Sequence, residues 1–273
     1  MLPIKKLYID SRFKSPDSVS DSDFYIDLPE TLLMPEGTGF YLDGISIPVT
    51  WYPITENKNN KIYIELYDLP QQFNPNRTTV TKTIVIEEGI YSTEELGSTL
   101  ATAINSAFSG DNFSVTVNYL RKSEKYTIAS SSGREWRILT DTEIEQKNYS
   151  KPFASINSVL QNNTPKLNTT SFTTGYINMY PIRNVYITSY GLGNFNTMSI
   201  SGERAVVKKV PVTAQYKKII FDQSVIGMDY LDCSKQTLSR IGFRLNTIYG
   251  EPIDLHGHHL SFSIVFSRIQ EIM

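Results

Sequence analysis

The stretch from residue 241 to residue 267 alternates between apolar and polar side chains, and this pattern constrains the fold more than any other feature. Ile241, Phe243 and Leu245 fall on one face of an extended strand, and a turn follows at residues 249–252. After the turn, apolar side chains return at every second position: Leu260, Phe262, Ile264 and Phe266. A period of two over this length predicts antiparallel strands with one buried face. A sheet protein that closes with a paired terminal strand usually has a mechanical or recognition role. We therefore take assembly as the first hypothesis for function and catalysis as the second.

Length and composition limit the possible classes of protein. The 273 residues suffice for one large all-β domain or two modest ones. The single cysteine, Cys233, excludes an intramolecular disulfide, and the first residues contain no apolar leader. We therefore expect a reducing compartment. No run of about 18 apolar residues occurs, so we expect no transmembrane segment.

The charge balance argues against a protein that wraps nucleic acid. The formal net charge is −2 and the isoelectric point is about 6.0, whereas proteins that bind through phosphates are usually basic. One local basic stretch, which we interpret as a solvated face or a subunit contact, contains Arg204, Lys208, Lys209, Lys217 and Lys218. We expect no direct nucleic-acid binding.

Shorter alternating patterns predict further strands, and one segment predicts a helix. Pro29 is expected to end the first of these strands, and Gly44 to mark a bulge in the second. Ser92 and Glu95 have the spacing of a capping box, so a helix should follow and end near residue 109. The expected strands cover residues 24–28, 40–49, 62–66, 80–86, 113–120, 125–129, 135–139, 176–179, 185–189, 206–212 and 218–221.

This distribution predicts an all-β fold, a single antiparallel jelly-roll β-sandwich of the Greek-key type with a small α+β insertion. Strands come from both ends of the chain, which favours pairing of early with late strands. The sandwich is expected to comprise residues 1–79 and 175–273, and the insertion residues 80–140. Residues 141–174 have no apolar period and are predicted to be a polar connector.

All three histidines lie in residues 254–259, and this segment is the strongest candidate for a metal site. His256 and His258 could share one face, as in a cupin-type jelly-roll enzyme, with Asp254 or Glu251 as a further ligand. However, the spacing does not fit the cupin pattern, and His259 is the only other histidine. We therefore interpret the segment as a polar turn that leads into a strand, and we assign no metal ligand.

The other candidates for chemistry are weaker. Cys233 has no base beside it in the sequence and is interpreted as a small filler in the core. Residues 191–194 resemble part of a glycine-rich loop but lack the helix that phosphate binding requires. The paired carboxylates Asp21/Asp23 and Glu87/Glu88 are expected to face solvent. We assign no catalytic, cofactor-binding or metal-binding residue, no cofactor and no enzymatic activity.

Several segments, taken in order, resemble the minor capsid (penton) proteins of Polinton/Maverick elements, adintoviruses and virophages. The resemblance covers nearly the whole chain and is weakest across residues 140–174. It is carried by the order and spacing of residues 8–29, 40–54, 59–66, 89–105, 185–212, 229–245 and 254–266.

The resemblance implies a structural protein of a virion capsid, made and assembled in the host cytoplasm or nucleus. In such families a single jelly roll forms homopentamers at the fivefold vertices of an icosahedral shell. The faces of that shell are trimers of a double jelly-roll major capsid protein. The segments 202–204 and 254–259 match the family without a ligand role. Both a virion protein and the product of an integrated element fit this interpretation.

Two other classes remain open at this stage. The chain could be a β-sandwich attachment module that binds a host-surface receptor or a glycan, with residues 80–139 as its exposed part. It could also be a cupin-like metalloenzyme, which the histidine spacing makes the least favoured class.

Overall fold

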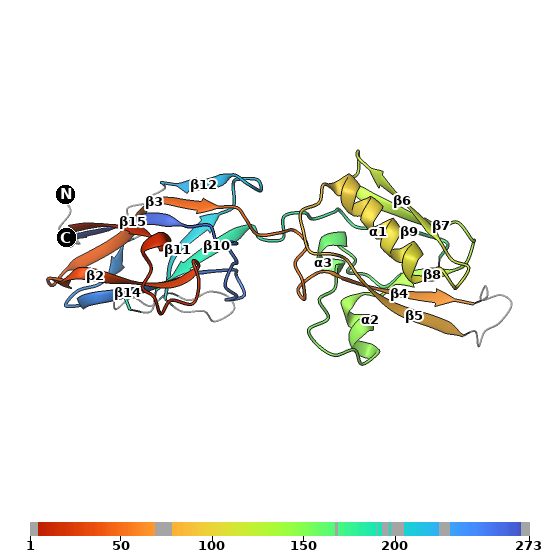
Figure 1. The fold of residues 1–273 in the computed structure, drawn as a ribbon, viewed down its shortest axis with the longest axis horizontal. Helices are drawn as coiled ribbons and strands as arrows, with labels where there is room; N and C mark the ends of the chain where they lie inside the picture. The colour runs from red at the N-terminus through yellow and green to blue at the C-terminus, as the bar shows by residue number, and fades with distance from the viewer. Residues whose placement is uncertain are drawn as a thin grey trace, which may run out of the picture. The chain divides into compact units, whose positions relative to one another are not determined.

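The computed structural model of the chain divides it into two compact units. Unit 1 comprises Met1–Trp51 and Ile182–Met273, and unit 2 comprises Tyr52–Pro181 (Figure 1). Each unit has its own hydrophobic core. The described residues are 5–68, 78–166, 169–189, 191–192, 197, 205–223 and 230–268.

The described part of unit 1 forms two antiparallel sheets. The first has the strand order β1-β15-β3-β12, and β13 also pairs with β3. The second has the order β11-β10-β14-β2. The bounds in the first sheet are β1 (Lys5–Asp10), β15 (Ser261–Arg268), β3 (Thr38–Pro48), β12 (Ile219–Asp222) and β13 (Leu231–Asp232). Those in the second are β11 (Val206–Pro211), β10 (Asn184–Thr188), β14 (Thr237–Asn246) and β2 (Asp23–Leu33). A short 3-10 helix, η1 (Ser11–Phe13), follows β1.

The order in which the chain visits the two sheets is that of a jelly roll. The chain passes from β1 in the first sheet to β2 in the second and back to β3 in the first. It then forms the hairpin of β10 and β11 in the second sheet, returns to β12 in the first, crosses to β14 in the second and ends with β15 in the first. The first strand, β1, and the last strand, β15, pair with each other, from Lys5 opposite Phe266 to Asp10 opposite Ser261. The predicted pairing of early with late segments is confirmed, although the sequence patterns did not identify β1 as a strand.

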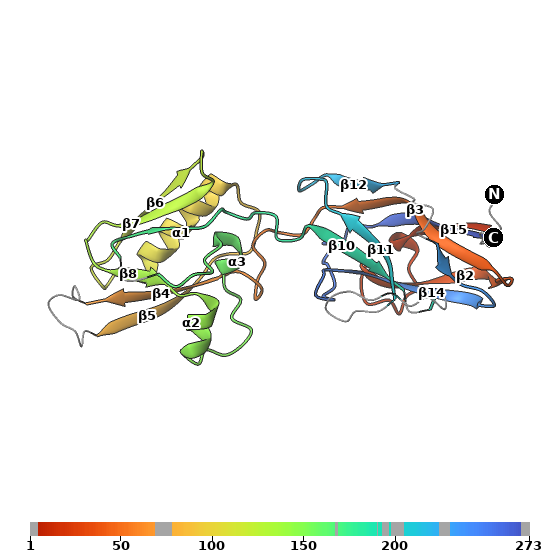
Figure 2. The same cartoon turned by 180° about the vertical axis from the view of Figure 1, so that it is seen from behind.

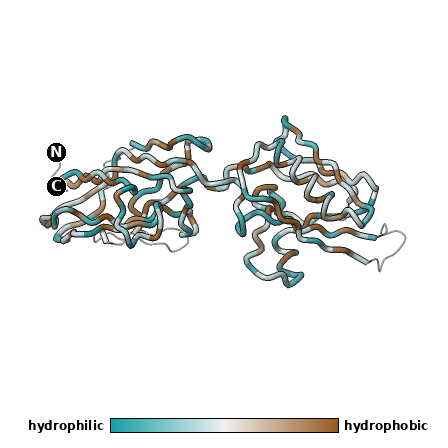
Figure 3. Tube along the Cα trace, in the orientation of Figure 1, coloured by the Kyte–Doolittle hydropathy of each residue, from teal (hydrophilic) through white to brown (hydrophobic). Residues whose placement is uncertain are grey.

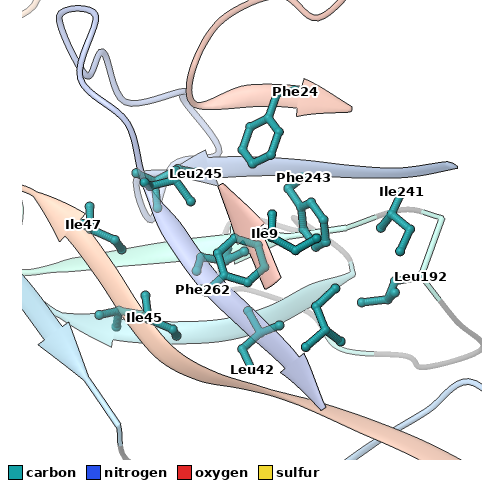
Figure 4. Close-up of a cluster of buried hydrophobic side chains, with 14 of the residues drawn as sticks. Ile9, Phe24, Leu42, Ile45, Ile47, Leu192, Ile241, Phe243, Leu245 and Phe262 are labelled. Atoms are coloured by element: carbon teal, nitrogen blue, oxygen red, sulfur yellow. The ribbon is translucent and has the colours of Figure 1, made fainter. Parts of the chain in front are cut away.

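The core of unit 1 lies between the two sheets. Phe262, on β15, projects inward because alternate side chains of a strand point to opposite faces. Its ring meets that of Phe243 at 5.0 Å in an edge-to-face arrangement, and Phe243 also lies 5.9 Å from Phe24. Figure 4 shows these rings packed with Ile9 and Leu42 from the first sheet. Each of the two units contains hydrophobic stretches of chain, coloured brown in Figure 3, in agreement with a separate core in each unit.

Two local predictions have different outcomes. Gly44 has a φ of +59°, and the pairing of β3 with β15 shifts register beside it, so the predicted bulge is confirmed. Pro29 does not end its strand, because β2 continues to Leu33. β2 is an edge strand of its sheet, and a proline without an N–H group is tolerated at an edge.

Unit 2 interrupts the connection between β3 and β10. Its described residues form two three-stranded sheets, β5-β4-β8 and β6-β7-β9, and three helices. The strands are β4 (Lys61–Tyr67), β5 (Thr79–Val85), β6 (Val115–Leu120), β7 (Lys125–Ser130), β8 (Trp136–Ile138) and β9 (Ser171–Thr173). The helices are α1 (Thr93–Ala107), α2 (Asp141–Gln146) and α3 (Asn157–Leu160).

Helix α1 follows the prediction closely. The Ser92 hydroxyl accepts a hydrogen bond from the Glu95 N–H, and the Glu95 carboxylate accepts one from the Ser92 N–H. Leu96, Leu100 and Ile104 are buried on one side of the helix. This side packs against the strands of unit 2 (Figure 2).

The extent of the inserted unit differs from the prediction. The insertion was expected to span residues 80–140, but the second compact unit starts at Tyr52 and ends at Pro181. The strand at residues 62–66 was predicted to belong to the sandwich, because its alternation of apolar and polar residues fits a half-buried strand of any sheet. In the structure this strand, β4, pairs with β5 and β8 of unit 2. Residues 141–174 contain α2, α3 and β9. A capping box at Thr140 and Glu143 begins α2.

Candidate functional site

The histidine segment forms a tight loop at the end of the sandwich where β15 begins. The Asp254 carboxylate accepts a hydrogen bond of 2.7 Å from the His256 N–H. His256 and Gly257 have positive φ angles of 50° and 74°. Because the backbone turns at these two residues, the strand alternation that would place His256 and His258 on one face is absent. The His258 Nδ1 lies 3.2 Å from the carbonyl oxygens of Leu255 and His256.

The same loop is tied to the segment that follows β1. The His259 Nδ1 lies 3.3 Å from the Asp21 carboxylate, which also pairs with Lys14 at 2.5 Å. The Leu260 N–H donates to the Ser11 hydroxyl. Within the described part of the chain, no three His, Cys, Asp or Glu side chains converge in a way that could hold a metal ion. The geometry is that of a structural tie.

Cys233 lies in the core of unit 1 and is fully buried. Its Sγ is 3.5 Å from the carbonyl oxygen of Thr38. Burial raises the pKa of the Cys233 thiol to about 12, and the nearby Asp232 adds to this shift. The thiolate that nucleophilic chemistry requires is therefore disfavoured.

Two glycine-containing segments fall partly or wholly outside the described residues. Of residues 191–194, only Gly191 and Leu192 are described, and Leu192 is buried in the core. Residues 202–204 lie outside the described residues altogether.

The carboxylate pairs have different surroundings. Asp21 and Asp23, which were expected to face solvent, have side chains only 17% and 15% exposed. Asp23 pairs with Arg244 at 2.8 Å across neighbouring strands. The expectation was wrong for Asp23 because β14, which supplies Arg244, is more than 200 residues away in the sequence. It was wrong for Asp21 because that carboxylate pairs with Lys14 and His259. Glu87 and Glu88 are exposed, as predicted.

The basic stretch lies on β11 and in the turn before β12. Lys209, Lys217 and Lys218 are exposed. Among the described residues, none of these three forms an ion pair. Arg204 lies outside the described residues.

The outer surface of the first sheet carries exposed apolar side chains, and we call it the aromatic face. Ile220 points into the core, so Ile219 and Phe221 on the same strand point outward, with 49% and 69% of their surface exposed. At the other edge of the sheet, Tyr8 is 80% exposed. Lys6, on the same strand as Tyr8, pairs with Asp43 on β3 at 3.0 Å.

The outer surface of the second sheet has a hollow instead. The Gly242 hollow has a volume of about 180 Å³ and lies between β2, β14 and β10. The Tyr25 ring occupies the space where a side chain on Gly242 would lie, since an added Cβ would be 2.7 Å from that ring. Arg240 stacks on Tyr25 at 4.4 Å, and Arg244 is also part of the lining.

One buried charge cluster was missed by the sequence patterns. Glu65, on β4, has a side chain only 3% exposed and pairs with Arg137 and Lys147, each at 2.6 Å. Its Oε2 also accepts a hydrogen bond from the Tyr67 hydroxyl. No local signal links Glu65 with partners that lie 72 and 82 residues further along the chain. The cluster holds β4, β8 and the end of α2 together.

Comparisons with known proteins identify a related fold. No family model matches the sequence, and no curated protein matches it. Among solved structures, the crystal structure of the selenomethionine-labelled mavirus penton protein is similar, with a TM-score of 0.54 and 9% sequence identity. The match covers 97% of this chain and 100% of that one.

The chain has the fold of the mavirus penton protein. The predicted jelly-roll class and the resemblance to virophage pentons are thereby confirmed at the level of fold.

Neither the histidine loop nor Cys233 has the geometry of a reactive site within the described part of the chain. No helix in the described part of the chain has the length and apolar character needed to cross a bilayer. The histidine loop is a tie between segments, and the one thiol is buried. The aromatic face and the Gly242 hollow are therefore the strongest candidates for interaction.

Proposed function

We propose that the chain is a minor capsid protein that occupies the fivefold vertices of an icosahedral shell as a homopentamer. In this role it contacts trimers of a double jelly-roll major capsid protein. It acts without a cofactor and without enzymatic activity, and its site of action is the virion, assembled in the host cytoplasm or nucleus. Its relatives would be the pentons of Polinton/Maverick elements, adintoviruses and virophages.

The observation that carries the proposal is the extent of the structural match. The penton fold is shared over both the jelly roll and the inserted unit, since 97% of this chain is covered. Jelly rolls leave few free strand edges, and a ring of copies can cover those that remain. A head-to-tail contact between copies closes into a ring when each copy is rotated by one fifth of a turn relative to the next, as fivefold symmetry requires.

The oligomeric state tests the proposal directly. Native mass spectrometry of the full chain, from about 1 to 100 μM, should show a species of five copies of the 31.0 kDa chain. Co-expression with a double jelly-roll major capsid protein should place the chain in shells. A monomer at every concentration, together with shells that exclude the chain, would contradict the proposed role.

A second candidate function, attachment to a host-surface receptor or glycan, is favoured by the inserted unit. Unit 2 has its own core. Its β6-β7-β9 sheet exposes uncharged polar side chains such as Thr116, Asn118 and Thr173, and Tyr176 nearby is 64% exposed. A variant in which a short Gly/Ser linker replaces residues 52–181 should keep pentamers and lose attachment to host cells. Unchanged attachment would assign any receptor binding to unit 1.

A further inference from the structure

The two outer surfaces of the sandwich differ in a way that suits contact between copies. The aromatic face belongs to the sheet containing β12 and β3, and the Gly242 hollow to the sheet containing β2 and β14. These sheets lie on opposite sides of unit 1 (Figure 1). A head-to-tail ring requires two different surfaces on each copy, facing its two neighbours.

The charged side chains at the centre of both surfaces are already paired within one copy. On the aromatic face, Lys6 is already paired with Asp43. Around the hollow, Arg244 pairs with Asp23, and Arg240 pairs with Asp17 and Asp27. Burial of an isolated charge is strongly unfavourable, whereas a pair formed within one copy keeps its partner.

The lysines beside the aromatic face, in the turn before β12, are not paired in this way. Lys217 and Lys218 are exposed and form no ion pair within the described residues. Their burial would remove unpaired ammonium groups from water. They immediately precede Ile219, so their long side chains can remain at the solvated rim while Ile219 and Phe221 are covered.

The apolar area fits the centre of an interface. An aromatic side chain removes about 150–250 Å² from water when it is buried. At 69% and 80% exposure, Phe221 and Tyr8 would together contribute about 220–370 Å². A specific contact buries about 800 Å² on each partner, with its binding energy concentrated in a few central residues. The aromatic face therefore supplies a core for such a contact.

The hollow on the other sheet has the size of one ring. A cavity of about 150 Å³ in another protein binds benzene, and the Gly242 hollow measures about 180 Å³. The Tyr25 ring, which lies over Gly242, provides an aromatic wall of the hollow. An exposed phenylalanine from a second copy matches both the volume and the chemistry.

We propose that the aromatic face of one copy packs on the next copy's β2–β14 surface, with Phe221 inserted in the Gly242 hollow. This inference rests on the proposed homopentamer and assigns the two surfaces that form it. Each copy presents the aromatic face to one neighbour and the hollow to the other, so that the contact repeats head to tail.

The first test removes the inserted ring from the full-length protein. Phe221→Ser should raise the concentration at which the oligomer dissociates by at least about tenfold, because central aromatic residues dominate such contacts. Tyr176→Ser is the control, since Tyr176 is a comparably exposed aromatic residue (64%) on unit 2. It should leave the dissociation concentration unchanged. Both variants should retain the wild-type circular dichroism spectrum, because both positions are at the surface.

The second test identifies the opposing surface. Cys233 is buried and is the only natural cysteine, so introduced cysteines can be cross-linked selectively with a bis-maleimide. The double variant Ser46→Cys/Asp27→Cys keeps Phe221 and Tyr25 in place, because Ser46 lies opposite Phe221 on β3 and Asp27 lies two residues after Tyr25 on β2. It should give a ladder of covalent species up to the pentamer on a denaturing gel. Each single variant should remain a monomer on that gel. Covalent dimers from Ser46→Cys alone would show that the face packs against itself, and would overturn the proposal.

The outcomes separate this inference from the proposed function. Pentamers that persist in Phe221→Ser, with no ladder from the double variant, would overturn the assignment of these surfaces and leave the penton role standing. A wild-type chain that neither self-associates nor enters shells would contradict the penton role itself.

Discussion

Replacement of Glu65 by glutamine tests how the inserted unit is held together. The Glu65 carboxylate is 3% exposed, and the side chains of its partners Arg137 and Lys147 are 22% and 35% exposed. Burial by itself would raise the pKa of Glu65, but hydrogen bonds from Lys147, Tyr67 and Arg137 outweigh it and lower the pKa below its ordinary value. The substitution removes the negative charge and leaves both cations without this partner.

The expected cost can be worked out from these contacts. Removal of one partner from a fully buried ion pair costs about 3–5 kcal/mol. Water reaches Arg137 and Lys147 in part, and Arg137 keeps its pair with Glu143. We therefore expect Glu65→Gln to lower the free energy of unfolding of unit 2 by about 2–4 kcal/mol at pH 7.

The effect should depend on pH with a definite sign. A carboxylate whose pKa is lower in the folded state stabilises the protein above its unfolded-state pKa. For glutamate that value is about 4.3. The contribution is lost as the pH falls from there through the folded-state pKa. The difference between wild type and Glu65→Gln should therefore be constant from about pH 7 to 5 and shrink below about pH 4.

Urea unfolding followed by tryptophan fluorescence provides the assay. The chain has two tryptophans, Trp51 in unit 1 and Trp136 in the core of unit 2. In a Trp51→Phe background, Trp136 reports unit 2 alone. Glu87→Gln is the matched control, because Glu87 is exposed, and it should change stability by less than about 0.5 kcal/mol. A loss below about 1 kcal/mol for Glu65→Gln, or one that persists unchanged at pH 3, would refute the reasoning.

Three further predictions follow from single contacts. Phe243→Ala should destabilise unit 1 by about 3–5 kcal/mol, because Phe243 packs between Phe24 and Phe262; calorimetry should show the transition of unit 1 shifted and that of unit 2 unchanged. Ser92→Ala removes the cap of α1 and should cost unit 2 about 1 kcal/mol in urea unfolding; equal stability would contradict the cap's role. The Cys233 thiol has a pKa of about 12, so at pH 8 it should resist iodoacetamide in the native protein and react in urea; rapid native alkylation, read by mass spectrometry, would contradict its burial.

Local patterns predicted those parts of the fold that depend on short-range interactions. Ser92 and Glu95 identify the start of α1 because a capping box lies within four residues. Phe262, Ile264 and Phe266 identify the core-facing side of β15 because strand alternation is local, but Ser263, Val265 and Ser267 on its other side are buried as well, so the strand is not half-buried as predicted. The same kind of signal was overlooked at Thr140 and Glu143, where a second capping box begins α2.

Local patterns could not predict which strands pair when the strands lie far apart in the sequence. The alternation of Ile62, Ile64 and Leu66 predicts a strand but not the sheet that receives it, and the boundary of the insertion was misplaced for that reason. The predicted strand at residues 176–179 is absent for a related reason. Its N–H groups at Ile177 and Asn178 bond to Glu124 and Val159 and not to a neighbouring strand.

The aromatic face shows the same limit of sequence-based prediction at the level of single side chains. Ile219, Ile220 and Phe221 are all apolar, so period-two analysis cannot decide which of them face outward. Pairing with β3 decides it, because Ile220 lies opposite the buried Ile47 and is itself buried. Its neighbours must then point to the other side of the sheet. The exposure of Phe221 is therefore a consequence of register between segments about 170 residues apart, and a surface built on it becomes visible only once both sheets are formed.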